Sequence, residues 1–250
     1  MKLLIDIGNT RIKWMLVGDQ LVVKGFDDDW SELEKHQGDI LSVWISCVGK
    51  RSTLAETVKR VKALCCVEPN VASVTTKLGL LVNQYKDLDR LGVDRWVVAV
   101  GARALHANGN LIIVDAGTAV TIDCVDAEHN YLGGAILPGF AMMHDSLVGR
   151  TAGISSQRQE VLNVIGENTQ ECVNSGAHFG LVGAIERVVS EIRLRLRGGH
   201  VTLLITGGDA EVVVAASCLP FSYQANLLFD GLICLSEQSL AAKNTLSSVS

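Results

Sequence analysis

The first residues that could carry out chemistry follow a short apolar run at residues 2–7. This run leads into Asp6-Ile7-Gly8-Asn9-Thr10. In such a turn the backbone N–H groups form a concavity that binds anions, and the threonine hydroxyl adds a donor. The aspartate can hold a divalent cation directly or through water. The pattern favours a site for nucleotide phosphates, although a plain hairpin turn uses the same residue types.

The same construction recurs about one domain's length later. The apolar run 111–114 leads into Asp115-Ala116-Gly117-Thr118, and Thr121 follows within an alternating apolar and polar segment. Two related turns are what a clamp around a polyphosphate needs. We therefore predict two related halves, residues 1–108 and 109–250, which each open with a strand, a turn and a strand.

A third candidate is Asp94, in Leu91-Gly92-Val93-Asp94-Arg95-Trp96. It lies in the first turn of an expected helix, where a carboxylate commonly complements the helix dipole. It could equally orient a hydroxyl for phosphoryl transfer, a reaction that asks mainly for positioning and charge stabilisation. Both interpretations remain open from the residues alone.

Two further glycine-containing segments need interpretation. Thr206-Gly207-Gly208-Asp209 follows an apolar run and could either receive an adenosine or connect a strand to a helix. Gly49-Lys50 suggests a P-loop only superficially, because Trp44 stands where the first glycine of that motif belongs.

These turns must be positioned by alternating strands and helices. Besides the strands already named, strand-like runs occupy 43–48, 131–137 and 201–206, and helical patterns occupy 53–64, 93–106, 168–197 and 225–240. Strands and helices that intermix in each half are typical of an α/β protein. The hairpin turns argue against a purely parallel sheet.

Charge disfavours nucleic acid as the main partner. The 250 residues carry 22 basic and 27 acidic side chains, a net charge of −5, whereas nucleic-acid binding depends on clustered Lys and Arg. Arginines gather only at 187–197, where we expect the solvated face of an amphipathic helix that turns Val188, Ile192 and Leu196 inward.

The sequence also argues against a membrane and against a secretory signal. The longest uncharged stretch, residues 212–229, contains Pro220, Ser222, Gln224 and Asn226, which interrupt any apolar spanning helix. The first apolar run is too short for a signal peptide. We expect a cytoplasmic protein.

Cysteines and histidines indicate neither disulfides nor zinc. The seven cysteines are scattered, contain no C-x-x-C pair and are expected to be buried thiols. The six histidines show no spacing typical of metal ligands.

Five ordered blocks now make the chain recognisable: it resembles type III pantothenate kinases, which belong to the acetate and sugar kinase, heat-shock chaperone and actin superfamily. The blocks are Asp6–Thr10, Tyr85 with Gly92–Trp96, Asp115–Thr121, Gly133–Gly139, and Gly166–Thr169 with Ser175-Gly176. The resemblance implies two ribonuclease-H-like domains, each a mixed sheet with flanking helices, with ATP in the cleft between them. It also implies a homodimer with the pantothenate site near the dimer interface.

The resemblance assigns the first loop to ATP and Mg²⁺. Its ATP contacts map to Asp6, Ile7, Gly8, Asn9, Thr10, Arg11, Ile12, Lys13 and Thr118. Asp6 would position Mg²⁺, and Asp115 would hold a monovalent cation, K⁺ or NH₄⁺.

The resemblance assigns pantothenate to Tyr85, Gly92, Val93, Asp94, Arg95 and Thr169, with Asp94 as the acceptor of the hydroxyl proton. The expected activity is ATP-dependent phosphorylation of pantothenate to 4′-phosphopantothenate, the first step of coenzyme A biosynthesis. Two alternatives remain. One is another kinase of the superfamily, and the other is a non-enzymatic accessory or regulatory homologue that retains the fold.

Overall fold

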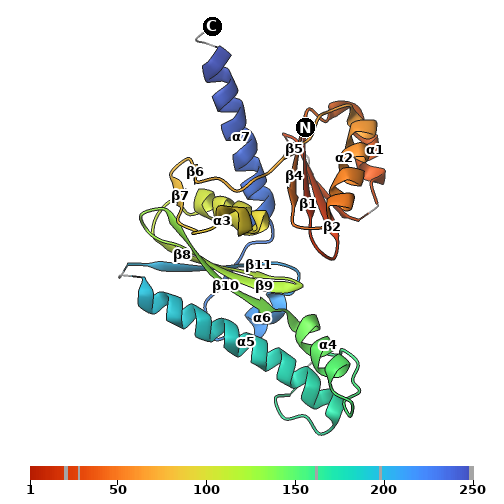
Figure 1. The fold of residues 1–250 in the computed structure, drawn as a ribbon, viewed down its shortest axis with the longest axis vertical. Coiled ribbons are helices and arrows are strands. Elements are labelled where there is room, and N and C mark those ends of the chain that lie inside the picture. Colours follow the sequence, from red (N-terminus) through yellow and green to blue (C-terminus); the bar gives the residue numbers. More distant parts are fainter. Residues whose placement is uncertain (20–21, 28, 161–162, 197–198, 248–250) are drawn as a thin grey trace. The chain divides into compact units, whose positions relative to one another are not determined.

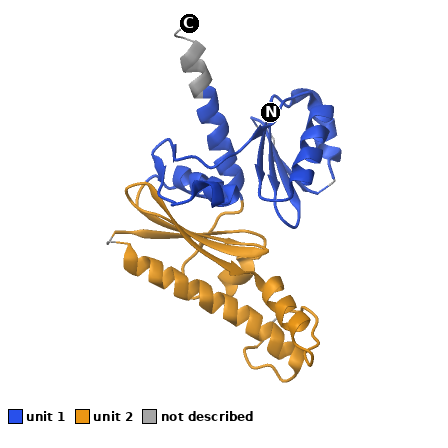
Figure 2. Cartoon of the chain, in the orientation of Figure 1, with its two compact units in different colours: residues 1–107, 226–250 blue, residues 108–225 orange. Residues whose placement is uncertain are grey.

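A computed structural model describes residues 1–19, 22–27, 29–160, 163–196 and 199–247 of the chain. The chain divides into two compact units (Figure 2). Unit 1 comprises residues 1–107 and 226–250, and unit 2 comprises residues 108–225. Unit 1 therefore consists of two separate stretches of sequence, because the last helix returns to it.

Among its described residues, unit 1 contains a five-stranded sheet, a small hairpin and four α-helices, whose arrangement Figure 1 shows. Its strands are β1 (Lys2–Ile7), β2 (Ile12–Val17), β3 (Val22–Phe26), β4 (Ser42–Cys47), β5 (Asn70–Val71), β6 (Lys77–Leu78) and β7 (Leu81–Asn83). Its helices are α1 (Ser31–Lys35), α2 (Arg51–Cys65), α3 (Val93–Leu105) and α7 (Leu227–Ser247), with 3₁₀ turns at Gln37–Asp39 and Leu88–Arg90.

The sheet of unit 1 has the strand order β3-β2-β1-β4-β5, and both of its faces are covered. Leu3, Ile5 and Ile7 of β1 pack with Leu33 of α1 and Val61 of α2, the two helices that Figure 1 shows beside this sheet. Side chains alternate along a strand, so β1 presents Leu4 and Asp6 to the opposite face. The continuous apolar run of β1 follows from this double burial.

That opposite face packs against α3 and α7. Leu4 of β1 shares a buried cluster with Val97 of α3 and Leu232 of α7. The two helices approach each other so closely that a Cβ on Gly101 would overlap the carbonyl oxygen of Leu227, and one on Gly231 would overlap that of Val97. Glycines are required at both positions because backbone meets backbone there.

In the part of unit 2 that the structure describes there are five strands and three α-helices. The strands are β8 (Asn110–Ala116), β9 (Ala119–Val125), β10 (Asn130–Pro138), β11 (Val201–Thr206) and β12 (Ser222–Tyr223), and the helices are α4 (Phe140–Arg150), α5 (Thr169–Arg195) and α6 (Ala210–Ala216). Ile112 and Ile122 of the sheet pack against Leu181 and Ile185 of α5, which runs along one face of the sheet.

The two units order their strands in the same way. In unit 2 the order is β10-β9-β8-β11-β12, so each unit opens with a central strand that pairs antiparallel with the next strand and parallel with a later one. The predicted fold class, a mixed α/β protein with two flanked sheets, is confirmed. The predicted domain boundary between residues 108 and 109 stays a prediction.

The principal predicted elements are present, with ends shifted by a few residues. The predicted strand 201–206 coincides with β11, and the predicted helix 168–197 appears as α5; residue 197 itself lies outside the described residues. On this helix Val188 and Ile192 pack against the core of unit 2, as expected of its amphipathic pattern. Among the described residues, no helix is both long and apolar enough to cross a bilayer.

The expectation that all cysteines are buried is wrong. Cys124 alone among them is buried, whereas Cys66, Cys172 and Cys218 are exposed, and all seven are free thiols. Cys66 follows the end of α2, where its backbone is left-handed (φ 57°). The two other exposed thiols lie at the start of α5 and just after α6.

Candidate functional site

The first predicted turn joins β1 to β2 and presents its backbone outward. The Gly8 N–H donates to the carbonyl oxygen of Arg11 at 3.2 Å, which closes the turn. Asn9, Thr10 and Arg11 are exposed, and Asp6 is half-buried at the end of the strand. The arrangement provides exposed amides and a hydroxyl beside a carboxylate, as an anion site with a cation requires.

A second loop fixes this turn from behind. Val48 and Gly49, which follow β4, each donate an N–H to the carbonyl oxygen of Ile7 at 3.1 Å. A Cβ on Gly49 would lie 2.7 Å from the carbonyl oxygen of Gly8, so a larger residue would displace the turn. The local sequence around Gly49 resembles a P-loop only superficially and does not indicate this supporting role, which comes from contacts with residues distant in sequence.

Asp94 lies in the first turn of α3, beside a glycine that makes room for it. Its Oδ1 accepts the backbone N–H of Arg95 at 2.7 Å. A Cβ on Gly92 would lie 2.5 Å from that same oxygen. Because Gly92 has no side chain, the Asp94 carboxylate can occupy this position. This explains why the Gly92–Arg95 block begins with a glycine.

Arg95 and Tyr85 lie together, as the predicted pantothenate residues require. Arg95 is only 6% exposed, and its guanidinium carbon lies 5.7 Å from the centroid of the Tyr85 ring. Tyr85 is itself held by its N–H, which donates to Asn83 Oδ1 at 3.0 Å. A cation over an aromatic face is attracted by the ring quadrupole, so this contact stabilises the guanidinium position.

The turn at Asp6 and the start of α3 lie on the same side of the unit 1 sheet. Val93 of α3 packs against the cluster that contains Leu4, and Asp6 points to the same face of β1 as Leu4. In the register of the sheet, Asp6 stands opposite Lys13 on β2 and Ser46 on β4. Unit 1 thus assembles the predicted phosphate turn and the predicted base on one face.

The second turn, in unit 2, is tighter than the first. Gly117 and Thr118 connect β8 to β9, and the Gly117 N–H donates to the carbonyl oxygen of Ala119 at 3.2 Å. Gly139 donates its N–H to the carbonyl oxygen of Thr118 at 3.1 Å and lies too close to the turn to carry a side chain. The Gly133–Gly139 block therefore supports the turn that bears Asp115 and Thr118.

The third glycine turn lies against Asp115. Gly207 has a φ of +98°, and a Cβ there would lie 2.6 Å from Asp115 Oδ1 and would overlap the carbonyl oxygen of Ala116. The N–H of Asp209 donates to that same carbonyl oxygen at 2.9 Å. Burial raises the pKa of Asp209 above its ordinary value. The turn connects β11 to α6, and its contact with adenosine stays a prediction.

Thr169 begins α5 and is exposed. The residues before it cap the helix: Asn168 Oδ1 accepts the N–H of Glu171 at 3.0 Å, and Glu171 Oε2 accepts the N–H of Glu167 at 2.8 Å. Such reciprocal bonds satisfy donors that a helix start leaves open. The Gly166–Thr169 block thus has a structural role, and the predicted substrate contact of Thr169 stays a prediction.

The residues present fit a magnesium ion that is bound partly by a protein carboxylate and partly by the phosphates of a nucleotide. Among the described residues no group of three or more His, Cys, Asp or Glu side chains could hold a metal ion alone. Mg²⁺ usually keeps several waters and takes one or two carboxylates plus substrate phosphates. The single carboxylate of Asp6, beside a turn suited to phosphates, matches that requirement.

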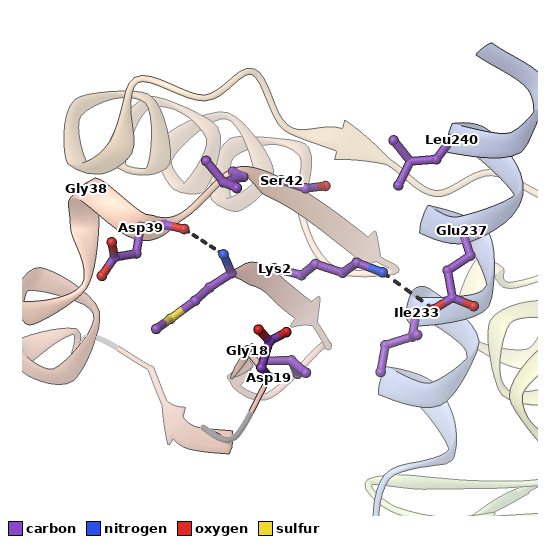
Figure 3. Close-up of a pocket in the computed structure, with 12 residues that line it drawn as sticks. Lys2, Gly18, Asp19, Gly38, Asp39, Ser42, Ile233, Glu237 and Leu240 are labelled. Atoms are coloured by element: carbon purple, nitrogen blue, oxygen red, sulfur yellow. Dashed lines mark hydrogen bonds and ion pairs between the residues drawn. The ribbon is translucent and has the colours of Figure 1, made fainter. Parts of the chain in front are cut away.

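Figure 3 shows a large cavity of unit 1 at the end of β1 that bears Lys2. It has a volume of about 1260 Å³ and is lined by residues that include Lys2, Asp39 and Glu237. An ion pair of 3.6 Å joins Lys2 Nζ to Glu237 Oε1, and the amino terminus donates to the carbonyl oxygen of Asp39 at 2.6 Å. This cavity lies at the opposite end of β1 from Asp6, and it contains none of the predicted site residues.

Comparisons with known proteins identify the fold and the family of the chain. A solved structure with the same fold is the activator of the 2-hydroxyisocaproyl-CoA dehydratase from Clostridium difficile with bound ADPNP, which is 12% identical, has a TM-score of 0.52 and covers 97% of each chain. The Type III pantothenate kinase of Verminephrobacter eiseniae is 34% identical over 96% of this chain and 98% of its own. That of Chromobacterium violaceum is 32% identical over 93% of this chain and 98% of its own. The family profile described as Type III pantothenate kinase matches residues 2–191, and the chain belongs to that family.

Proposed function

We propose that this chain transfers the γ-phosphoryl group of ATP to the primary hydroxyl of pantothenate. The product is 4′-phosphopantothenate, and the reaction is the first step of coenzyme A biosynthesis. Membership of the family and relatives of more than 30% identity over nearly the whole chain support the proposal. The observation that carries it is the Gly92–Arg95 block, where Asp94 and an aromatic-bound Arg95 occupy successive positions.

Asp94 acts as the acceptor for the proton of the attacking hydroxyl. The N–H of Arg95 fixes one oxygen of the carboxylate, and the start of α3 favours its negative charge. A base of low strength is sufficient, because the loose transition state of phosphoryl transfer demands positioning more than deep deprotonation. General base catalysis by a positioned carboxylate contributes about 10²–10⁴-fold in rate.

Arg95 binds the carboxylate of pantothenate. A guanidinium grips a carboxylate with two parallel hydrogen bonds, and the Tyr85 ring keeps the guanidinium in place for that contact. Gly92 and Val93 provide backbone beside the substrate, and Thr169 adds a hydroxyl. Holding the substrate in one orientation lowers the entropic part of the barrier.

The phosphates of ATP bind to the turn from Asp6 to Lys13. Amides of the turn and the Thr10 hydroxyl stabilise charge on the transferred group, and Thr118 contributes a further ATP contact. The ADPNP bound in the dehydratase activator supports a nucleotide on this fold. Mg²⁺, when bound by Asp6 and the phosphates, supplies charge neutralisation for the γ-phosphoryl group.

Asp115 holds a monovalent cation, K⁺ or NH₄⁺. Its Oδ1 is placed beside Gly207, whose lack of a side chain leaves the carboxylate accessible to an ion. A positive ion there adds to the positive potential that a protein of net charge −5 must create locally for two anionic substrates. The enzyme acts as a cytoplasmic homodimer in this proposal.

The test is a coupled assay of ADP release with pantothenate, with other small alcohols and without acceptor, each in the presence and absence of K⁺. We expect turnover that depends on both pantothenate and K⁺. The Asp115→Ala variant should retain turnover and lose the response to K⁺. ADP release that does not depend on pantothenate, or that is faster with another alcohol, would overturn the assigned substrate. An Asp115→Ala variant whose turnover still responds to K⁺ would overturn the cation assignment.

A further inference from the structure

Ser46, on β4, carries a buried hydroxyl whose presence the packing of the fold does not explain. The residue is 0% exposed, and its Oγ has no hydrogen-bond partner among the described residues. Buried polar groups are normally hydrogen-bonded, and an exception calls for an explanation such as a water, an ion or a catalytic role. The surroundings of Ser46 show which of these applies.

Ser46 is the direct neighbour of Asp6. In the parallel pairing of β1 with β4, Ser46 stands opposite Asp6, just as Trp44 stands opposite Leu4 two residues earlier. Paired residues of adjacent strands point to the same face of a sheet. The hydroxyl of Ser46 therefore points to the face that bears the Asp6 carboxylate and the start of α3.

The middle of that face, next to Ser46, is apolar, so packing does not explain a serine. Leu4 and Met15 form a buried cluster there with Val97, and Trp44 packs against it. An alanine at position 46 would fill nearly the same volume without burying a hydroxyl, and would avoid the cost of an unsatisfied polar atom. The serine is thus costly for folding.

Unit 2 repeats the arrangement at its own aspartate. Asp115 on β8 stands opposite Thr206 on the parallel strand β11, and Thr206 is 6% exposed. Each unit therefore places a buried hydroxyl residue beside the aspartate that precedes its phosphate turn. The repetition ties the hydroxyl to the aspartate and not to local packing.

We propose that Ser46 is a positioning residue for the cation that accompanies ATP: its hydroxyl binds a water of the Mg²⁺ shell beside Asp6. This inference rests on the proposed function of Asp6. Mg²⁺ gives up its waters reluctantly, so a group that holds one of them orients the whole ion. Outer groups of this kind typically change metal affinity by about 10–100-fold when they are removed.

The experiment compares Ser46→Ala with the full-length wild type in two measurements. Thermal unfolding without nucleotide should show a melting temperature that is unchanged or raised by about 2–4 °C, because the unsatisfied hydroxyl is gone. Isothermal titration calorimetry of ADP at varied Mg²⁺ should show Mg²⁺-dependent binding weakened by about 10-fold or more. Stability and cation binding then move in different directions, which a purely structural serine would not produce.

Two further variants serve as controls. Ser236→Ala removes another buried hydroxyl of unit 1, which is 1% exposed and donates to the carbonyl oxygen of Ile233 at 2.7 Å. This variant should not gain stability and should keep the Mg²⁺ dependence. Ser46→Thr keeps the hydroxyl, as Thr206 does in unit 2, and should restore most of the Mg²⁺-dependent binding.

The outcomes separate this inference from the proposed function. Ser46→Ala with wild-type Mg²⁺-dependent ADP binding, or with a clearly lower melting temperature, overturns the role of Ser46. A wild type that binds Mg²⁺ and ADP but shows no turnover with pantothenate overturns the assigned substrate and leaves the inference about Ser46 standing.

Discussion

The guanidinium of Arg95 lies over the ring of Tyr85, with 5.7 Å between the guanidinium carbon and the ring centroid. Arg95 is nearly buried, yet its charge is placed at a residue block assigned to an anionic substrate. The contact stabilises the position of the guanidinium. A planar guanidinium is the partner that a carboxylate binds through two hydrogen bonds. We therefore expect that a positive charge alone at position 95 is not sufficient to bind pantothenate.

Arg95→Lys tests that requirement. Lysine keeps the charge but loses the planar fork and the broad contact with the ring. We expect the KM for pantothenate to rise by about 10–100-fold, because a hydrogen bond to a charged group is lost. The KM for ATP should change less. Steady-state kinetics measures both constants. Arg103→Lys, a buried arginine of the same helix that donates to the carbonyl oxygen of His106, is the control and should leave pantothenate binding unchanged.

Asp94→Asn tests the proposed proton acceptor. The amide keeps the shape of the carboxylate but cannot accept the hydroxyl proton, so kcat should fall by about 10²–10⁴-fold. The melting temperature should change little, because the bond from the Arg95 N–H has an oxygen acceptor in both residues. Asp89→Asn, which changes an exposed aspartate, is the matched control. Turnover of Asp94→Asn close to the wild-type rate would remove Asp94 from the mechanism.

Gly207→Ala tests the contact between the third glycine turn and Asp115. The φ of +98° and the nearby carbonyl oxygen of Ala116 both oppose a side chain. We expect a loss of about 1–3 kcal/mol in unfolding free energy, together with a weaker response to K⁺. Gly208→Ala is the control, because a Cβ there meets no heavy atom within 4 Å. Urea unfolding and K⁺-dependent turnover report on the two effects, and equal behaviour of the two variants would contradict the contact.

The free energy of unfolding should depend on pH in part through the titration of His178. Burial lowers the pKa of His178 below its ordinary value of 6.5, and its ring stacks on Phe140 with centroids 5.4 Å apart. Because the folded pKa is the lower one, the stability contribution is complete above pH 6.5 and is lost as the pH falls through the folded pKa.

His178→Phe keeps an aromatic ring and removes that titration. Between about pH 7 and about pH 5 the variant should lose less unfolding free energy than the wild type, as measured by urea unfolding at several pH values. His200→Phe changes an exposed histidine and should follow the wild-type curve. Parallel curves for His178→Phe and the wild type would show that His178 does not contribute to the pH dependence.

The sequence predicted the elements that carry a strong local signal. The run at β1 is apolar throughout because both faces of the strand are covered, and the turn at Gly8 follows from residues that accept unusual backbone angles. Helix α5 was predicted because its apolar residues repeat with a helical period. Asp94, Asp115 and Gly207 stand out by residue type and spacing, whereas Tyr85 and the Gly133–Gly139 block enter only through the resemblance to a known family.

Other features depend on contacts that one sequence does not reveal. Strands β5, β6 and β12 have two residues each, too few for any period, and α4 lacked a recognised signal. Gly49 supports the first turn through residues distant in sequence, and its local neighbours suggested a different motif. The sequence predicts only a strand over 43–48 and does not single out Ser46, because its position beside Asp6 arises from the register of β4 with β1.

The return of the chain to unit 1 sets an order of assembly during synthesis. Helix α3 emerges from the ribosome well before α7, and the whole of unit 2 lies between them in the sequence. Val97 and Gly101 therefore lack their partner helix while unit 2 can already complete its own sheet. Because domains generally fold as units as they are synthesised, the unit that begins first is the one that is finished last.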